Sequence, residues 1–305
     1  MTSIRDLLSP TSQASPERVE PRGRDGGATE EAGEAGETTA TAARTTYFVV
    51  EFILDLVCPY CYLGLKSLDA AIETYRARHP AAVFEVTCSP FLLDPQAARS
   101  AYDKATYLAR GRVHTAAQLA ALGRGAGIAF AWAGRTGSTR DAHKVLRLAL
   151  EGGSGGSGAP STARSTAFAG RGRGGGAEAP GRGPALQLRL LRALLRAHHE
   201  LGADISAREW LVGAAAAAAP GIPPAEVRRV VYGEHAAAGQ REDQPPDEWD
   251  RALDGLCADV RARRCSTAGA DAEPAIRAVP TLVVNERYVI GGWQTADRLV
   301  FVPKT

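Results

Sequence analysis

Two cysteines separated by two residues are the part of this sequence whose types and spacing most directly suggest chemistry. They form the run Cys58-Pro59-Tyr60-Cys61. Disulfide exchange requires a thiolate near neutral pH, whereas a free cysteine has a pKa of about 8.5. At the N-terminus of a helix, the unpaired N–H groups of the first turn and the helix dipole would stabilise a Cys58 thiolate. Pro59 suits the first helical position, because it has no N–H and its φ is already helical.

The spacing predicts different roles for the two sulfurs. One helical turn separates Cys61 from Cys58, so the two can form a disulfide, and Cys61 is expected to be the more buried. Cys58 is therefore predicted to attack a disulfide, and Cys61 to resolve the mixed disulfide that forms. A bare C-x-x-C is a weak signal, but one that follows a buried strand and precedes an amphipathic helix is strong.

The sequence around the cysteines predicts a strand, a helix and a second strand. Residues 47–57 are β-branched, aromatic and almost continuously apolar, as in a strand buried on both faces. Apolar residues then recur at helical spacing from Leu63 to Tyr75, and Pro80 ends this helix. Residues 83–88 alternate between apolar and polar types, which indicates a second strand. In one sheet this order implies a parallel crossover.

Strand character returns near the end of the chain. Val279-Pro280-Thr281 opens a third strand over residues 281–284, a tight turn follows at 285–287, and residues 288–290 form a fourth strand. A short helical piece is expected from Thr295. We expect the Val279–Pro280 bond to be cis and to lie beside the cysteines, with its backbone free to pair with a substrate peptide as a short strand.

The complete order predicts an α/β protein with a thioredoxin fold, βαβ…ββα, split by a large inserted all-helical domain. Residues 45–91 and 275–305 are assigned to the thioredoxin-like domain, and residues 92–274 to the insertion. Residues 1–44 contain few large apolar side chains, so a disordered tail is predicted. The glycine- and arginine-rich stretch 152–183 is predicted to be a disordered loop within the insertion.

Charge and composition argue against several kinds of partner. The chain has 36 basic and 34 acidic residues, a net charge of +2, which indicates neither nucleic acid nor an anionic membrane as a partner. The arginines of 152–183 resemble an RNA-binding segment, but Phe168 is the single aromatic residue there, and a tolerated insertion is favoured. No apolar run approaches the ~20 residues that cross a bilayer, and no secretory signal is recognised. A cytoplasmic location is therefore expected.

The remaining cysteines and histidines give weaker signals. The five cysteines, at positions 58, 61, 88, 257 and 265, are an odd number and do not resemble a disulfide scaffold. No second close pair completes a zinc site, so no bound metal is predicted. Cys88 is interpreted as a small buried apolar residue. His143, on a predicted helix after Ser138, is a candidate to face the redox pocket.

Several segments resemble FrnE-type, DsbA-like thioredoxin-domain proteins. They are residues 55–64 around the two cysteines, 90–95, 139–143, 204–206, and 278–281 with Gly291-Gly292. The resemblance implies a thioredoxin fold with an inserted helical domain, dithiol–disulfide exchange, and no bound cofactor. Cys58 and Cys61 are then the catalytic residues, and the substrate is expected to contact Pro59, Tyr60, Val279, Pro280 and His143.

Two alternatives to disulfide exchange remain open. The related 2-hydroxychromene-2-carboxylate isomerases and kappa-class glutathione transferases have serine where this chain has Cys58, and they use glutathione as cosubstrate. Cys58 favours redox chemistry, with a disulfide-containing protein or a small thiol such as glutathione as the partner. A non-catalytic module that presents the Pro280 edge to another protein is the second alternative.

The proton of Cys61 has no predicted acceptor. Thioredoxins and DsbA proteins commonly place a buried carboxylate six residues before the first cysteine, and Phe52 occupies that position here. Glu51 is expected on the opposite face of the strand, and Asp55 in the turn that leads to Cys58.

Overall fold

The computed structural model describes residues 45–98, 102–106, 114–151, 181–233, 246–263 and 276–301. The predicted tail 1–44, residues 152–180 of the predicted loop, and Cys265 lie outside these ranges.

The described elements include the predicted strands and helices of the thioredoxin fold, together with two short strands that were not predicted. They are β1 (Tyr47–Leu54), α2 (Pro59–Arg78), β2 (Val83–Pro90), β3 (Tyr102–Asp103), α4 (Ala116–Gly125), β4 (Arg135–Thr136), α5 (Arg140–Leu150), α6 (Pro184–Glu200), α7 (Arg208–Ala218), α8 (Pro224–Tyr232), α9 (Glu248–Ala262), β5 (Thr281–Val284), β6 (Tyr288–Gly291) and the 3₁₀ helix η1 (Ala296–Arg298).

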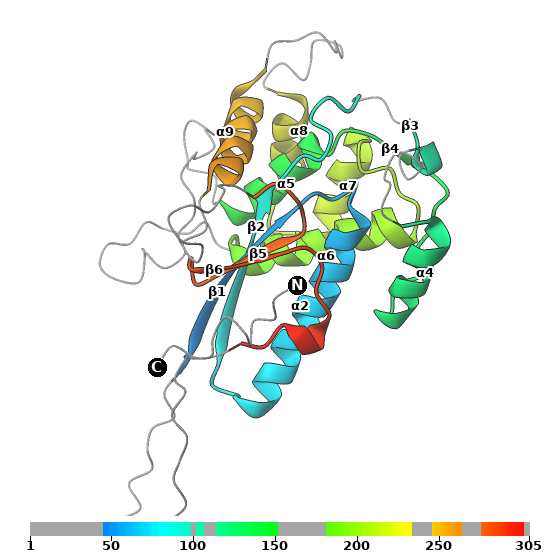
Figure 1. The fold of residues 1–305 in the computed structure, drawn as a ribbon. Coiled ribbons are helices and arrows are strands. Elements are labelled where there is room, and N and C mark those ends of the chain that lie inside the picture. The colour runs from blue at the N-terminus through cyan, green and yellow to red at the C-terminus, as the bar shows by residue number, and fades with distance from the viewer. Residues whose placement is uncertain are drawn as a thin grey trace, which may run out of the picture.

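Four strands form one mixed sheet, in the order β2-β1-β5-β6 (Figure 1). β1 and β2 are parallel and are joined through α2, whereas β1 pairs with β5, and β5 with β6, in antiparallel fashion. This arrangement is the βαβ…ββα order of the thioredoxin fold. The predicted α/β fold class is therefore confirmed.

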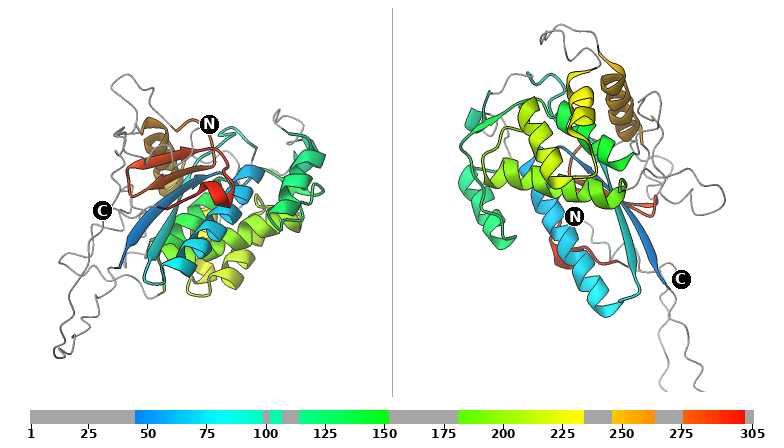
Figure 2. Two further views of the ribbon diagram at one scale, coloured as in Figure 1. Left: turned by 60° about the horizontal axis from the view of Figure 1, so that its bottom comes forward. Right: turned by 180° about the vertical axis from the view of Figure 1, so that it is seen from behind.

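β1 is buried on both faces because its side chains alternate between two cores. Phe48, Val50, Phe52 and Leu54 belong to the large core that includes the apolar face of α2. Ile53 lies in a smaller core on the other face, together with Val260 of α9 and Val283 of β5. α2 and α6 contact each other, and Figure 2 shows them side by side on one side of the sheet.

The predicted tight turn between β5 and β6 is present. Asn285 and Glu286 have positive φ values of 51° and 57°, which the two central residues of a type I′ hairpin turn require. The Asn285 side-chain oxygen accepts a hydrogen bond from the Val49 amide at 3.0 Å, and this bond ties the turn to β1.

The insertion is not all-helical, and this part of the prediction is wrong. β3 and β4 form a two-stranded antiparallel sheet through the pairs Tyr102–Thr136 and Asp103–Arg135. In the sequence, both strands lie between β2 and α5. A strand of two residues is too short for an alternating pattern to appear in the sequence. The domain boundaries at 91–92 and 274–275 stay predictions.

Candidate redox site

The C-x-x-C motif lies at the start of α2, just after the turn that follows β1. Cys58 is the N-cap residue of α2, with extended backbone angles (φ −81°, ψ 114°), and Pro59 occupies the first helical turn. The Cys58 amide donates a hydrogen bond to the Asp55 carbonyl at 3.1 Å, which closes the turn after β1. The Cys58 side chain therefore lies at the amide end of a 20-residue helix, where negative charge is stabilised.

The two thiols differ in their surroundings, although both are buried. Cys58 is 4% exposed and Cys61 is fully buried, and the two side chains are hydrogen-bonded to each other. Both are free cysteines. Burial raises the pKa of the Cys61 thiol well above its usual value, and the hydrogen bond and charge of Cys58 raise this pKa further. Cys61 is consequently held in the protonated form.

The start of β5 lies against the motif. The Val279–Pro280 peptide bond is cis, and the Cys58 Sγ lies 4.0 Å from the Val279 carbonyl oxygen. Gly64 makes this approach possible, because a Cβ atom at Gly64 would lie only 3.1 Å from Cγ of Pro280. Two segments that are far apart in the sequence thus form one site.

Tyr60 lies at the edge of this site. Its side chain is partly buried, and its hydroxyl is hydrogen-bonded to Nδ1 of the exposed His114. Burial raises the pKa of the Tyr60 phenol, and the nearby Cys58 adds to the effect. The sequence analysis did not select His114, because nothing in the local pattern relates it to a residue 54 positions earlier.

A buried carboxylate and a buried imidazole lie behind the cysteines. Asp55 is 1% exposed, and its carboxylate accepts hydrogen bonds from the amides of Leu93 (2.8 Å) and Val57 (3.5 Å). Nε2 of His143, itself 4% exposed, lies 3.7 Å from Oδ1 of Asp55. His143 thus stands next to Asp55 and away from the surface. In the sequence, the feature that could have pointed to Asp55 is its acidic side chain within a largely apolar run.

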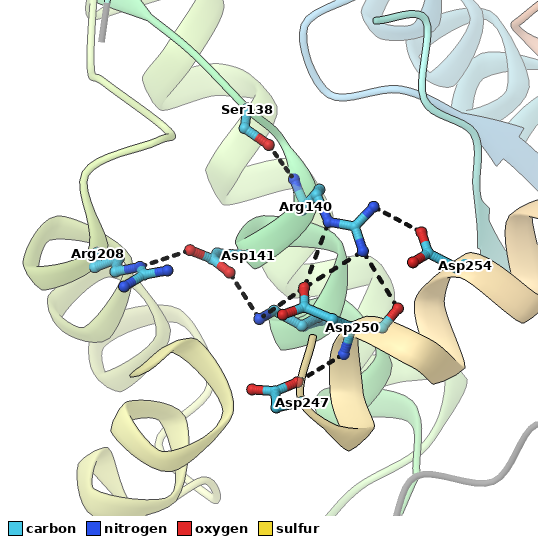
Figure 3. Close-up of polar contacts among 8 residues, drawn as sticks. Ser138, Arg140, Asp141, Arg208, Asp247, Asp250 and Asp254 are labelled. Atoms are coloured by element: carbon cyan, nitrogen blue, oxygen red, sulfur yellow. Dashed lines mark hydrogen bonds and ion pairs between the residues drawn. The ribbon is translucent and has the colours of Figure 1, made fainter. Parts of the chain in front are cut away.

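Ion pairs hold the helix that carries His143 (Figure 3). Lys144 on α5 is fully buried. Its Nζ lies 2.8 Å from Oδ1 of Asp141 and 3.4 Å from Oδ1 of Asp250 on α9. Arg208 on α7 binds the second oxygen of Asp141 at 2.8 Å, and Arg140 binds Asp250. Removing one partner of such a buried group costs about 3–5 kcal/mol. α5 is therefore fixed to two other helices.

The described residues were also compared with the requirements of a metal site and of a membrane-spanning helix. They contain no group of three or more His, Cys, Asp or Glu side chains arranged to hold a metal ion. Within the same ranges, no helix combines the length and the apolar character that crossing a membrane requires.

The structure therefore brings Cys58, Pro59, Cys61, Val279 and Pro280 together, with Tyr60 at the edge. Thioredoxin-fold proteins with a dithiol at this position form a broad class, and residues 49–157 match the model of the family described as DSBA-like thioredoxin domain. This part of the chain is similar to that family.

The chain is also similar to solved structures, and one of them, with a TM-score of 0.53, has the same fold. A probable DsbA oxidoreductase from Streptomyces coelicolor is 22% identical, with 82% of this chain and 86% of that chain covered and a TM-score of 0.53. A putative protein disulfide isomerase from Nitrosomonas europaea is 16% identical (83% and 94% covered, TM-score 0.44). The cytosolic disulfide reductase DsbM from Pseudomonas aeruginosa, solved with glutathione, is 17% identical (79% and 89% covered, TM-score 0.39). No curated protein matches the sequence.

Proposed function

We propose that this protein is a thiol–disulfide oxidoreductase that exchanges disulfides through Cys58 and Cys61. The observation that carries the proposal is the position of the Cys58 Sγ, at the start of α2 and 4.0 Å from the Val279 carbonyl, with Cys61 within hydrogen-bonding reach. A FrnE-type assignment is consistent with the DsbA-like domain.

The reaction takes place in two exchanges. The Cys58 thiolate attacks one sulfur of a substrate disulfide, and the other substrate sulfur leaves as a thiolate. The Cys61 thiol then loses its proton and attacks Cys58, which releases the second substrate sulfur and forms the Cys58–Cys61 disulfide. The substrate gains two electrons and two protons, and the protein loses them. The reverse sequence oxidises a dithiol substrate.

The segment before Pro280 is proposed to bind the substrate. Pro280 has no N–H, and the Val279 carbonyl is directed to the cysteines, so an extended peptide or a glutathione backbone can pair with Val279 as a short strand. The substrate class is therefore a disulfide in an extended protein segment or a small peptide thiol such as glutathione.

Reduction of insulin disulfides tests the proposal. The wild-type protein, kept reduced by dithiothreitol, should precipitate the insulin B chain, and both Cys58→Ser and Cys61→Ala should lose at least about 10²-fold in rate. A Cys58→Ser variant with unchanged activity would overturn the proposal. A glutathione-dependent isomerase would instead keep its conversion with serine at this position.

A further inference from the structure

Substrates must reach Cys58 through a narrow opening. The residue is 4% exposed, although its thiolate is the group that attacks a disulfide. A substrate therefore has to bring one of its sulfurs into contact with the Cys58 Sγ past the side chains around it. Those side chains decide which disulfides react.

Tyr60 is one of the side chains beside this opening. Tyr60 and Gly64 are four residues apart on α2, so they lie on the same face of the helix, and Gly64 faces Pro280. Tyr60 is nearer to the start of α2, where the Val279 carbonyl lies 4.0 Å from the Cys58 Sγ. Both Tyr60 and Val279 are partly buried. The phenol ring thus borders the same sulfur as the segment proposed to bind the substrate.

A histidine from another part of the chain holds the far end of the Tyr60 side chain. Burial and the charge of Cys58 raise the pKa of the Tyr60 phenol, so its hydroxyl is protonated. This hydroxyl donates a hydrogen bond to Nδ1 of His114, which accepts it in the neutral imidazole. The two ring centroids lie 5.7 Å apart, with the ring planes at 53°. Because an untethered side chain can take more than one rotamer, the contact fixes the ring where it borders Cys58.

The position of His114 is set by the helix that follows it. Thr115 is the N-cap of α4, and its hydroxyl accepts a hydrogen bond from the Gln118 amide at 3.3 Å. The Gln118 side chain in turn accepts a hydrogen bond from the Thr115 amide at 2.8 Å, which completes a capping box. α4 contacts α2, and Figure 1 shows the two helices beside each other. A segment between β2 and α5 in the sequence therefore reaches the edge of the redox site.

We propose that His114 is a positioning residue that holds the Tyr60 ring as a wall of the opening to Cys58. The wall selects small or flexible peptide disulfides, such as that of oxidised glutathione, over the disulfides of folded proteins. This inference rests on the disulfide exchange proposed above and names its preferred substrates. His114 acts through Tyr60, because its own contact is with the phenol hydroxyl.

Two reaction rates of each full-length variant, both relative to the wild type, test the selection. One is the rate of insulin reduction in excess dithiothreitol, and the other is the rate at which oxidised glutathione oxidises the reduced protein. In His114→Ala the preference should shift toward insulin by about tenfold, since the ring no longer closes the opening. Loss of packing alone would change both rates in the same proportion.

Three further variants show whether the effect passes through the hydrogen bond. Tyr60→Phe keeps the ring and loses the hydroxyl, so it should shift the preference as His114→Ala does. The double variant should add nothing, because both changes remove one interaction. His114→Asn, whose amide oxygen can accept the phenol proton, should restore the wild-type preference.

The other end of α2 provides a matched control. Tyr75 and the exposed His79 also form a tyrosine–histidine pair, with ring centroids 4.4 Å apart. This pair lies at the C-terminal end of the helix, away from Cys58. His79→Ala should therefore leave the preference between the two substrates unchanged.

Alkylation of Cys58 measures the opening without any turnover. In Cys61→Ala protein, peptide mass spectrometry compares the rates at which iodoacetamide and a bulky fluorescein maleimide modify Cys58. Adding His114→Ala should raise the rate with the bulky reagent by about tenfold relative to iodoacetamide. An unchanged ratio of the two rates overturns the inference.

The outcomes separate this inference from the proposed function. Active His114→Ala and Tyr60→Phe proteins with the wild-type preference overturn the inference alone. A wild-type protein that reacts with neither insulin nor oxidised glutathione overturns the proposed function, and this inference with it.

Discussion

The four cysteines among the described residues differ in what their surroundings allow. Cys61, Cys88 and Cys257 are buried, and burial raises the pKa of each thiol; for Cys257 it does so to about 12. Cys58 is the one of the four at a helix N-terminus and beside the Val279 carbonyl. Cys58 should therefore be the most reactive of these four thiols.

Alkylation should reveal this difference directly. At pH 7.5, iodoacetamide should modify Cys58 of the reduced native protein at least about tenfold faster than Cys61, because the thiolate is the reactive form and Cys61 is kept protonated. Peptide mass spectrometry over a time course measures both rates. In guanidinium chloride the rates should converge, and equal rates in the native protein would contradict the account.

At the residue scale, the sequence predicted the two cysteines as the centre of the site but not the residues that surround them. Cys58 and Cys61 were recognisable because their spacing and flanking pattern are local. Asp55 and His143 meet through the packing of α5 behind the turn after β1, and no local pattern encodes that contact. Phe52 occupies the position where related proteins commonly have a carboxylate, so the sequence predicted no acceptor for the proton of Cys61.

At the element scale, the site depends on how closely β5 approaches α2. Gly64 lies in the second turn of α2. Pro280 lies so close to it that a Cβ atom on Gly64 would crowd the proline ring. The contact lets the Val279 carbonyl reach Cys58. This glycine in the interior of α2 lowers the stability of the helix by about 1 kcal/mol relative to alanine.

Replacing this glycine should impair function more than stability. In Gly64→Ala the new Cβ would meet Pro280 Cγ at 3.1 Å, so Pro280 must shift, and the rate of insulin reduction should fall about tenfold. In Gly255→Ala on α9 a Cβ meets no atom within 4 Å, so activity should be unchanged and stability should increase by up to about 1 kcal/mol. Equal activity in the two variants would contradict the proposed role of this contact.

The elements themselves were largely predictable. β1, α2 and β2 have strong apolar patterns, and Asn285-Glu286 marked the hairpin because asparagine tolerates a positive φ. β3 and β4 were missed, since two paired residues in each strand leave no periodic signal. The ion pairs of Lys144 could not be foreseen, because an isolated lysine in a helix pattern ordinarily indicates a solvated face.

At the scale of the whole molecule, buried histidines make the stability of the fold depend on pH. His198 and His199 on α6 are buried, and burial lowers the pKa of both, that of His198 to about 4. The unfolded chain takes up protons at these positions below about pH 6.5, and the folded protein does not. Stability contributed by the neutral imidazoles is therefore complete above about pH 6.5 and is lost as the pH falls toward 4.

The free energy of unfolding should accordingly decrease between pH 7 and pH 5. Each histidine can contribute a slope of at most about 1.4 kcal/mol per pH unit. Urea unfolding at several pH values measures the slope, which should be smaller in His198→Gln than in the wild type. The exposed His79 provides the control, because His79→Gln should leave the slope unchanged. A free energy independent of pH in this range would contradict the prediction.

Intact mass measurement with oxidised glutathione tests the central claim most directly, namely that Cys58 attacks a disulfide and Cys61 resolves the product. Cys61→Ala should gain one glutathione, located at Cys58 by peptide mapping, and should keep it. The wild-type protein should instead lose two hydrogens and carry a Cys58–Cys61 disulfide, and Cys58→Ser should form no adduct at Cys61. A Cys61→Ala protein without glutathione at Cys58, or a wild-type protein that retains the adduct there, would contradict the account.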